Sequence, residues 1–325
     1  LFAQWIKVAD DGSITVPGSD GKPGTTDDVT VKPNPDPGAG EDGKPKPNPD
    51  GTITVPEGGS VDTPTGEIEL PEGGTVKPDG TIIIPDPTDP DKPGTEVDPA
   101  KPETPPTGTY LVTYDPGAAT GSNKVKYVYV KTGSDHIVLA NNFTYDGHVF
   151  VYWTDENGGR LKVGRDTVSN TATITANWLV QKDDGTIVIP DPDNQPDGTI
   201  EVKPDPENPG NKPGVDDNGD ITVPPGGEVE KKPDGGSVEL PDGGTVTVPD
   251  GGIKLPDGTP IDPDNPDNLP EGWYVVEYHA NDGSARGTMS KQVSKDVVQA
   301  KQNRFELDGN TFTEWNTKPN GTGDK

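Results

Sequence analysis

Cysteine is absent from this chain of 325 residues, and methionine occurs only once. Without thiols, the chain can form neither disulfide bonds nor thiolate metal sites. Apolar runs of about 18 residues, the length needed for a membrane-spanning helix, are also absent. The sequence therefore predicts no membrane insertion in this segment.

Basic residues are scarce relative to acidic ones. The chain has 27 Lys and Arg against 56 Asp and Glu, which gives a formal net charge of -29. Binding to nucleic acid requires clustered cations that neutralise phosphates, and binding to anionic lipid depends on cations in the same way. The charge balance excludes nucleic acid as a partner and disfavours anionic membranes.

Hydrophobic residues are also few, at 27%, whereas the chain has 43 glycines and 39 prolines. Most aromatic residues, and most of the alternation of β-branched with other residues, lie in two segments, 110–180 and 272–325. Pro, Gly, Asp, Thr and Val dominate the segments 8–107 and 181–270, here called arms. Their composition lies near the low-complexity border, so the arms have little apolar material for a core of their own.

Modules and arms alternate as a tandem repeat. The opening LFAQWIKVADDGSITVP matches ITANWLVQKDDGTIVIP, which aligns Trp5 on Trp178. In the same way Tyr110 aligns on Tyr274, and Trp153 on Trp315. We predict five parts: a closing strand of an upstream module at 1–7, an arm at 8–107, a module at 108–180, a second arm at 181–270 and an incomplete module at 271–325.

Alternation of apolar and polar residues with a period of two predicts β-strands in the aromatic module. The segments from Tyr110 to Tyr114, KVKYVYVKTG, VFVYW and TATITANW all have this pattern. The segment SDHIVLANN, residues 134–142, resembles a helix entry with Ser134 as its cap. At roughly 70 residues, the module is large enough to fold without disulfide bonds.

The module resembles the Listeria–Bacteroides repeat, the β-grasp-like B-repeat of internalins. The resemblance rests on Y-x-V-x-Y, then L-A-N-N-F-T-Y-D-G-H-V-F-V-Y-W, then a closing T-I-T-A-N-W. It implies a structural or adhesive role on a secreted or surface-anchored bacterial protein, and it brings no catalytic residues. The positions it implies as structural core are Tyr110, Tyr114, Phe143, Phe150, Trp153 and Trp178, and in the second copy Tyr274, Tyr278, Phe305, Phe312 and Trp315.

The resemblance also implies the fold class and a strand order. The chain is expected to be mainly β, with small β-grasp-like modules alternating with Pro/Gly-rich arms. The first and last strands of a β-grasp module are neighbours in its sheet. The strands around Tyr110 and Ile174 would then share a mechanical load in shear.

The arms carry regularly spaced apolar residues followed by turns such as P-D-G-G. Pro presets the first turn position and Gly tolerates left-handed geometry, so each turn has a mechanism. The arms are therefore short β-ladders, folded as a meander or as a narrow solenoid, or else extended linkers. One ladder would place Val238, Leu240, Val246 and Val248 on a single face, which needs a partner from a neighbouring module or another chain.

Residues able to support catalysis or metal binding are few. The three histidines, His136, His148 and His279, occupy different positions in the two modules, which argues against a shared catalytic base. We expect no enzymatic activity and no cofactor. Aspartate-rich runs offer oxygen ligands for calcium, although no EF-hand loop is present. The weak calcium candidates are Asp262, Asp264, Asp267, Asp191 and Asp193.

These features favour a structural stalk in a tandem-repeat protein of the bacterial cell surface. Two alternatives stay open: a subunit of an extracellular filament or biofilm matrix fibre that shares strands between chains, and an adhesin module that binds a host glycan or protein. Expected partners are neighbouring copies of the same repeat, in cis or in trans. The segment Leu1, Phe2, Ala3, Gln4 and Trp5 is interpreted as a closing strand, left by a cut through the array or offered to a neighbour's sheet.

Overall fold

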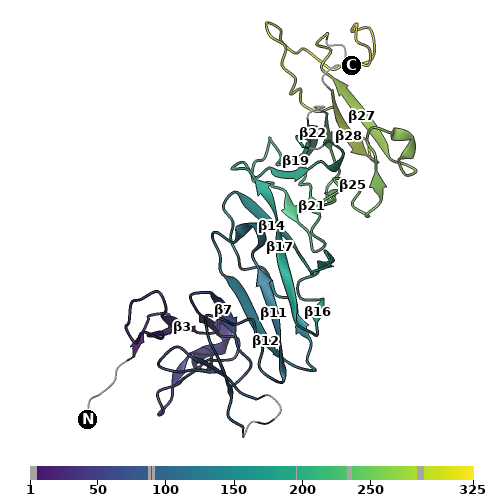
Figure 1. Ribbon diagram of the computed structural model, residues 1–325. Coiled ribbons are helices and arrows are strands. Elements are labelled where there is room, and N and C mark those ends of the chain that lie inside the picture. Colours follow the sequence, from purple (N-terminus) through teal and green to yellow (C-terminus); the bar gives the residue numbers. More distant parts are fainter. Residues whose placement is uncertain (1–5, 87–88, 90–91, 195, 233–235, 284–288) are drawn as a thin grey trace. The chain divides into compact units, whose positions relative to one another are not determined.

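A computed structural model describes residues 6–325 except 87–88, 90–91, 195, 233–235 and 284–288 (Figure 1). The protein is mainly β, as the sequence predicts. The suggested strand formed by Leu1, Phe2, Ala3, Gln4 and Trp5 lies outside the described residues. The chain divides into two compact units, Leu1–Tyr145 with Tyr152–Asn177, and Asp146–Val151 with Trp178–Lys325.

The first arm contains two antiparallel ladders. The first has the order β1-β2-β3-β6-β7 and the second has the order β10-β9-β8-β5-β4. The strands of the first ladder are β1 (Lys7–Val8), β2 (Ile14–Val16), β3 (Val29–Lys32), β6 (Ser60–Asp62) and β7 (Gly66–Glu69). Those of the second are β4 (Lys46–Pro47), β5 (Ile53–Thr54), β8 (Thr75–Val76), β9 (Ile82–Ile84) and β10 (Thr95–Val97), and a 3-10 helix, η1 (Pro37–Gly43), precedes β4.

Two kinds of turn connect the strands of the first arm. The turns at Pro56–Gly59 and Pro71–Gly74, both P-E-G-G, carry the chain from one ladder to the other. Both close with a hydrogen bond from the last Gly N–H to the Pro carbonyl, 2.9 and 3.1 Å long. Turns of the type D-G-T or D-G-S, as at Asp79–Thr81, instead join neighbouring strands of one ladder.

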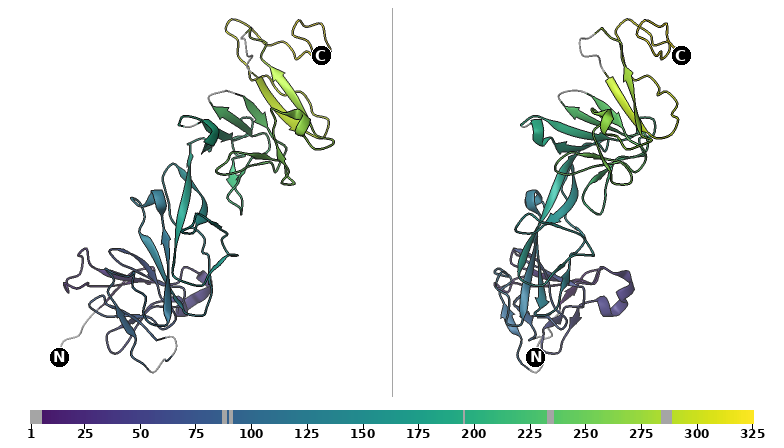
Figure 2. Two further views of the ribbon diagram at one scale, coloured as in Figure 1. Left: turned by 45° about the vertical axis from the view of Figure 1, so that its right-hand side comes forward. Right: turned by 90° about the vertical axis from the view of Figure 1, so that its right-hand side faces the viewer.

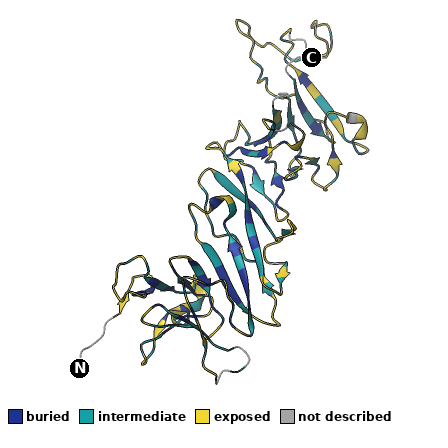
Figure 3. Ribbon diagram, in the orientation of Figure 1, coloured by how far each residue is buried: buried dark blue, intermediate teal, exposed yellow. Residues whose placement is uncertain are grey.

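The inner faces of the two ladders build the core of the first arm. Buried residues of both ladders form one cluster, including Val31 and Ile68 from the first and Ile53 and Ile82 from the second. Along these strands the buried positions alternate with more exposed ones (Figure 3). The arm therefore supplies its own partner layer, because the chain folds each ladder against a second one.

The second arm repeats this arrangement. Its ladders have the orders β18-β19-β22-β23 and β20-β21-β24-β25-β26. The first consists of β18 (Ile187–Pro190), β19 (Thr199–Lys203), β22 (Glu228–Lys232) and β23 (Ser237–Glu239). The second consists of β20 (Gly214–Val215), β21 (Ile221–Thr222), β24 (Thr245–Val246), β25 (Ile253–Lys254) and β26 (Pro260–Ile261). The arm also contains two 3-10 helices, η3 (Pro192–Asn194) and η4 (Pro266–Asn268).

These arms correct part of the prediction for the Pro/Gly segments. They are β-ladders rather than extended linkers, but neither a simple meander nor a solenoid. Val238 lies in β23, whereas Val246 lies in β24, so the two are in different sheets and not on one shared face. The P-D-G-G turn between them crosses from one sheet to the other, and Leu240 and Val248 are buried.

The first module is built on three long strands that lie side by side (Figure 1). β12 (Val125–Lys131) is antiparallel to β11 (Thr109–Asp115), and β17 (Ala172–Gln181) is parallel to β11. β14 (His148–Thr154) pairs with β17 and with β15 (Arg160–Leu161), and a 3-10 helix, η2 (Gly117–Ala119), follows β11.

The helix predicted for residues 134–142 does not form. Instead, β13 (His136–Ile137) pairs with β16 (Thr167–Val168) in a small antiparallel sheet. The next N–H, that of Val138, donates to the Asp166 carbonyl at 3.0 Å, and the Val138 side chain is buried. Long-range pairing to residues 166–168 thus replaces the local hydrogen bonds of a helix.

The second module contains β27 (Tyr274–His279) and β28 (Met289–Ser294), an antiparallel pair. From Lys295 to Lys325 the chain has no strand, although all these residues are described. Figure 2 shows this segment as a trace without arrows in both views. The alignment of Trp153 with Trp315 makes residues 310–316 the counterpart of β14, so this part of the second module is irregular.

Candidate functional site

The closing strand of the first module lies beside its first strand, as the resemblance implies. Val112, Thr113, Tyr114 and Asp115 pair in parallel with Ala172, Thr173, Ile174 and Thr175. The two strands are parallel neighbours, and they are the first and the last long strands of the module in the sequence. Pulling on the two chain ends of the module therefore shears several backbone hydrogen bonds at once. This pairing is the structural element best suited to bear a load.

An aromatic cluster fastens the loops of the first module to this pair of strands. The Trp153 ring meets Tyr114 and Phe143 edge-on, with centroid distances of 5.1 and 6.0 Å. Its indole N–H donates to the Leu139 carbonyl at 3.0 Å, so the buried polar group is satisfied. The Tyr114 hydroxyl accepts from the Leu139 N–H and lies 2.8 Å from His136 Nε2.

Burial shifts the titration of this cluster. It raises the pKa of Tyr114 to about 12 and lowers the pKa of His136. Both side chains are therefore neutral near pH 7, where their hydrogen bond joins two uncharged groups. His148 and His279 lie elsewhere, near the Asp146 carbonyl and Glu277 respectively, so the three histidines are not brought together.

The second module keeps the Tyr–Phe–Trp contacts of this cluster. Trp315 meets Tyr278 and Phe305 edge-on at 5.1 and 6.0 Å. Its indole N–H donates to the Lys301 carbonyl at 2.7 Å, and the Lys301 N–H donates to the Tyr278 hydroxyl. Lys301 thus stands where the first module has Leu139, and the backbone contacts are the same in both copies.

Most residues predicted as structural core are buried or half-buried. Tyr110, Tyr114, Trp153 and Tyr278 are buried. Five others are half-buried: Phe143, Phe150, Trp178, Phe305 and Trp315. Two are exposed, Tyr274 at 36% and Phe312 at 46%, which corrects their assignment to the core. Their counterparts have further contacts: the Tyr110 hydroxyl donates to the Val168 carbonyl of β16, and the Phe150 ring meets the Trp178 ring of β17.

A parallel strand pair joins each arm to the module that follows it. In the first unit, Gly66 to Glu69 of β7 pair with Val125 to Val128 of β12. Leu111, Tyr127 and Tyr129 of the module belong to the same buried cluster as the arm core. This arm and its module therefore share one sheet and one core.

The second arm joins the second module in the same way. Ser237, Val238 and Glu239 of β23 pair with Ser290, Lys291 and Gln292 of β28. Ile68 pairs with Tyr127 in the first unit, and Val238 pairs with Lys291 in the second. The alignment of Tyr110 on Tyr274 also places Tyr127 on Lys291, so the two junctions have the same register. A Pro/Gly arm followed by an aromatic module is thus one structural repeat, which occurs twice.

Comparisons with known proteins bear on this repeat. Residues 110–177 and 274–325 match the profile of the Listeria-Bacteroides repeat domain. The suspected resemblance is confirmed. No curated protein and no solved structure matches the chain. Repeats of this family are typical of surface proteins, and no helix among the described residues is long and apolar enough to cross a membrane.

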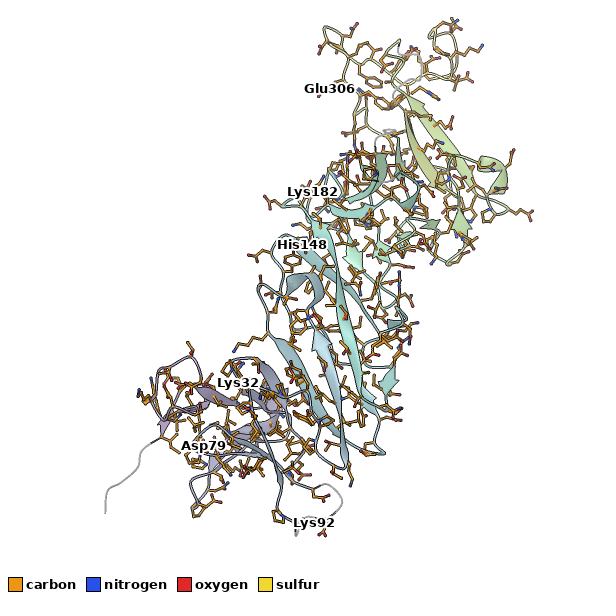
Figure 4. All side chains as sticks on the ribbon, in the orientation of Figure 1. Lys32, Asp79, Lys92, His148, Lys182 and Glu306 are labelled. Carbon is orange, nitrogen blue, oxygen red and sulfur yellow. The ribbon has the colours of Figure 1, made fainter. Side chains whose placement is uncertain are left out.

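Ion pairs reinforce the junctions between the arms and the Listeria-Bacteroides repeats. In the first unit, Lys126 pairs with Glu69 at 3.0 Å, and Lys124 with Asp62 at 2.7 Å. Within the arm, Lys32, which is labelled in Figure 4, pairs with Glu67 at 3.3 Å. These charges link strands that are distant in the sequence.

In the second unit, the Lys301 ammonium group lies 2.9 Å from Glu239 and 3.3 Å from Glu228. The Lys301 side chain is 9% exposed, so its charge is largely withdrawn from solvent and is compensated by the two carboxylates. Sequence reasoning missed these contacts. The alternation of Glu and Lys in EVEKK and SVE is a signal that could have indicated an ion-paired face.

Three of the five calcium candidates, Asp191, Asp262 and Asp264, accept hydrogen bonds from the protein itself. Asp191 and Asp262 accept the backbone N–H two residues on, at Asp193 and Asp264. Asp264 also accepts from the Lys291 ammonium group at 2.6 Å, and Asp267 lies in the first turn of η4. Within the described part of the chain, no group of three or more His, Asp or Glu could hold one ion.

Proposed function

We propose that the chain is a structural stalk segment of a tandem-repeat protein on the bacterial cell surface, supporting adhesion. The observation that carries this proposal is the parallel pairing of β11 with β17. A module whose first and last strands are neighbours resists extension through bonds that break together. An arm that shares a core with the following module, as in the first unit, adds length without adding a flexible linker.

Charge and composition agree with this role. A net charge of -29 favours solubility of the protein. An extracellular location on a bacterium and the absence of enzymatic activity belong to the same proposal. The adhesin alternative would need exposed aromatic residues to contact a host glycan or protein. It gains less support because Tyr127, Tyr129 and Trp153 are buried.

Single-molecule pulling on the whole chain tests the proposal. Unfolding of the first module should appear as a high-force event that releases about 70 residues, on the order of 20 nm of extended chain. A smooth extension without such an event would contradict the stalk role.

Two proline variants at paired positions show whether the β11–β17 pair carries the load. The Leu111 N–H lies on the β17 side, where it donates to Thr171 Oγ1, so strand alternation places the Thr113 N–H on that side too. Thr113→Pro removes this donor and should lower the unfolding force. Thr173→Pro is the matched control, because the Thr173 N–H donates to Glu156 Oε1 on the other side of β17.

A further inference from the structure

Each of the two repeats has a hollow at the junction between its arm and its module. The hollow has a volume of about 230 Å³ in the first unit and about 190 Å³ in the second. The lining of the first hollow includes three arm residues and three module residues: Lys32, Asp62, Glu67, Lys126, Asn142 and Phe143. The lining of the second hollow includes the residues at the same places: Lys203, Glu230, Ser237, Ser290, Arg304 and Phe305.

The two hollows are structural counterparts. Lys32 lies opposite Ser60 in the β3–β6 pair, and Lys203 lies opposite Glu228 in the β19–β22 pair. On the module side, the phenylalanine of each hollow meets the tryptophan of its aromatic cluster edge-on at 6.0 Å. Because the hollow recurs although several of its side chains differ, it follows from the way an arm joins its module.

The charged groups around both hollows are already paired with one another. In the first, Lys32 Nζ lies 3.3 Å from a Glu67 oxygen and 3.6 Å from an Asp62 oxygen. In the second, Lys203 pairs with Glu230. A charged ligand would have to break such a pair. A neutral ligand would not, because an ammonium group has three donors and a carboxylate about four acceptor sites, and one ion pair leaves most of these unused.

Neutral polar side chains also line the hollows, and they make no side-chain hydrogen bond among the described residues. They are Ser122 and Asn142 in the first hollow and Ser237, Ser290 and Gln302 in the second. The phenylalanine of each hollow is half-buried and supplies an apolar wall. A sugar ring matches this lining, because each of its hydroxyls both donates and accepts and its C–H groups pack against an apolar surface.

We propose that each hollow binds one ring of a neutral sugar. The hollows are smaller than the roughly 300–1,000 Å³ typical of sites for drug-sized ligands, which suits a single ring. Two of the lining side chains, those of Lys124 and Arg304, keep 49% and 36% of their surface exposed, so each hollow is open to solvent. The ring therefore belongs either to a free sugar or to the end of a glycan chain.

This inference goes beyond the stalk role, which requires no ligand. Polar side chains supply most of the contacts, so the site also differs from the exposed aromatic surface that the adhesin alternative would need. The pulling experiment above measures the β11–β17 pair, which lines neither hollow, so the two proposals can fail separately.

Saturation-transfer-difference NMR on the whole chain tests the class of ligand. The probes are the methyl glycosides of glucose, galactose, mannose and N-acetylglucosamine, each compared with its free sugar. At least one neutral probe should receive several-fold more saturation than glucuronate or glucosamine, which carry a charge. Transfer to a methyl glycoside would show that a chain end is accepted, and transfer to free sugars alone would identify a free sugar as the ligand. Absence of transfer to every neutral probe would overturn the proposal, as would equal transfer to the charged probes.

Paired variants locate the site. Asn142→Ala combined with Gln302→Ala removes one unpartnered amide from each hollow, and the saturation transfer should fall several-fold. Asn157→Ala combined with Gln299→Ala is the matched control, because both residues are exposed and line neither hollow. Circular dichroism of both double variants verifies that the fold is kept. Equal transfer in the two double variants would place the sugar elsewhere and would overturn the proposal.

Amide chemical shifts of the unaltered chain give a second measurement of the site. Shifts that move on addition of the bound sugar should cluster at residues 122–126 and 301–305, which lie in or beside the two hollows. Movements confined to other segments would equally overturn the proposal.

Discussion

Glycine at position 66 sets the distance between the first arm and its module. A Cβ atom at Gly66 would lie 2.6 Å from Tyr127 Cε2 and 2.6 Å from the Val125 carbonyl oxygen. Real Cβ atoms do not approach backbone so closely, so the parallel strands β7 and β12 would have to separate. Close packing at this junction depends on the missing side chain.

Gly66→Ala should therefore destabilise the chain by about 1–3 kcal/mol, the usual cost of overpacking a tight contact. Gly236→Ala is the matched control, because Gly236 takes the corresponding place before β23 and an added Cβ there meets nothing within 4 Å. Chemical denaturation of both variants measures the difference. Equal losses of stability would contradict the role assigned to the junction.

Aspartates in the D-G-T and D-G-S turns bind the backbone rather than a ligand. Asp50, Asp79 and Asp257 each accept the N–H two residues on, at 2.9 to 3.0 Å. These hydrogen bonds hold the pKa of each carboxyl below its usual range. The same kind of bond lowers the pKa of Asp11 and of Asp184.

Stability should consequently fall in acid. A carboxyl whose pKa is lower in the folded state stabilises the fold above its unfolded value, near 3.8, and loses that contribution as the pH falls through the folded value. Melting temperatures should be flat above about pH 5 and decline below about pH 4. Asp79→Asn keeps an acceptor oxygen but does not titrate, so its acid decline should be shallower. An unchanged profile would contradict this account.

At the scale of elements, the aromatic cluster joins the irregular segment of the first module to its sheet. Trp153 is 1% exposed and contacts Tyr114, Phe143 and the Leu139 carbonyl. These partners come from β11 and from the irregular segment between β13 and β14. Loss of the indole would leave a cavity and would remove the donor to that carbonyl, at the point where the loops meet the sheet.

Trp153→Ala should cost about 3–5 kcal/mol, as expected for a large buried aromatic residue. Trp178→Ala, which removes a half-buried ring of the same size, should cost less and serves as the comparison. Thermal unfolding followed by near-UV circular dichroism reports both. A greater loss of stability in Trp178→Ala than in Trp153→Ala would show that the Trp153 cluster is not the main packing contact of the module.

Carboxylates on the sheet surfaces also form ion pairs with lysines. Glu201 is buried, and burial by itself raises its pKa. Hydrogen bonds from Lys182 at 2.7 Å and Lys232 at 3.0 Å outweigh this effect and hold the pKa of Glu201 below its usual range. One carboxylate of β19 thus joins β22 and the turn before β18. Such cross-strand pairs stabilise the short strands of the arm.

At the scale of the whole molecule, the acidic charge of the described residues is spread over turns and ion pairs rather than gathered into metal sites. Calcium should therefore not raise the melting temperature beyond the effect of sodium chloride at matched ionic strength. Differential scanning calorimetry with and without a chelator measures this. A saturable rise with calcium would show a specific site and would restore the candidates Asp262 and Asp191.

Much of the architecture could be predicted from the sequence by itself. The alignment of Trp5 on Trp178, the period-two strands and the Tyr–Phe–Trp spacing define the repeat, because each reflects a local pattern of side chains. The neighbouring positions of β11 and β17 followed from the family resemblance. The turns after Val and Leu in the arms were also identified from Pro and Gly alone.

Only the tertiary structure decided how these pieces pair. Sheet membership in the arms depends on contacts between residues far apart, such as Ile53 with Val76, which turn sequences do not encode. Residues 134–142 became strand and loop because Asp166 offered a partner to Val138, overriding a weak local helix signal.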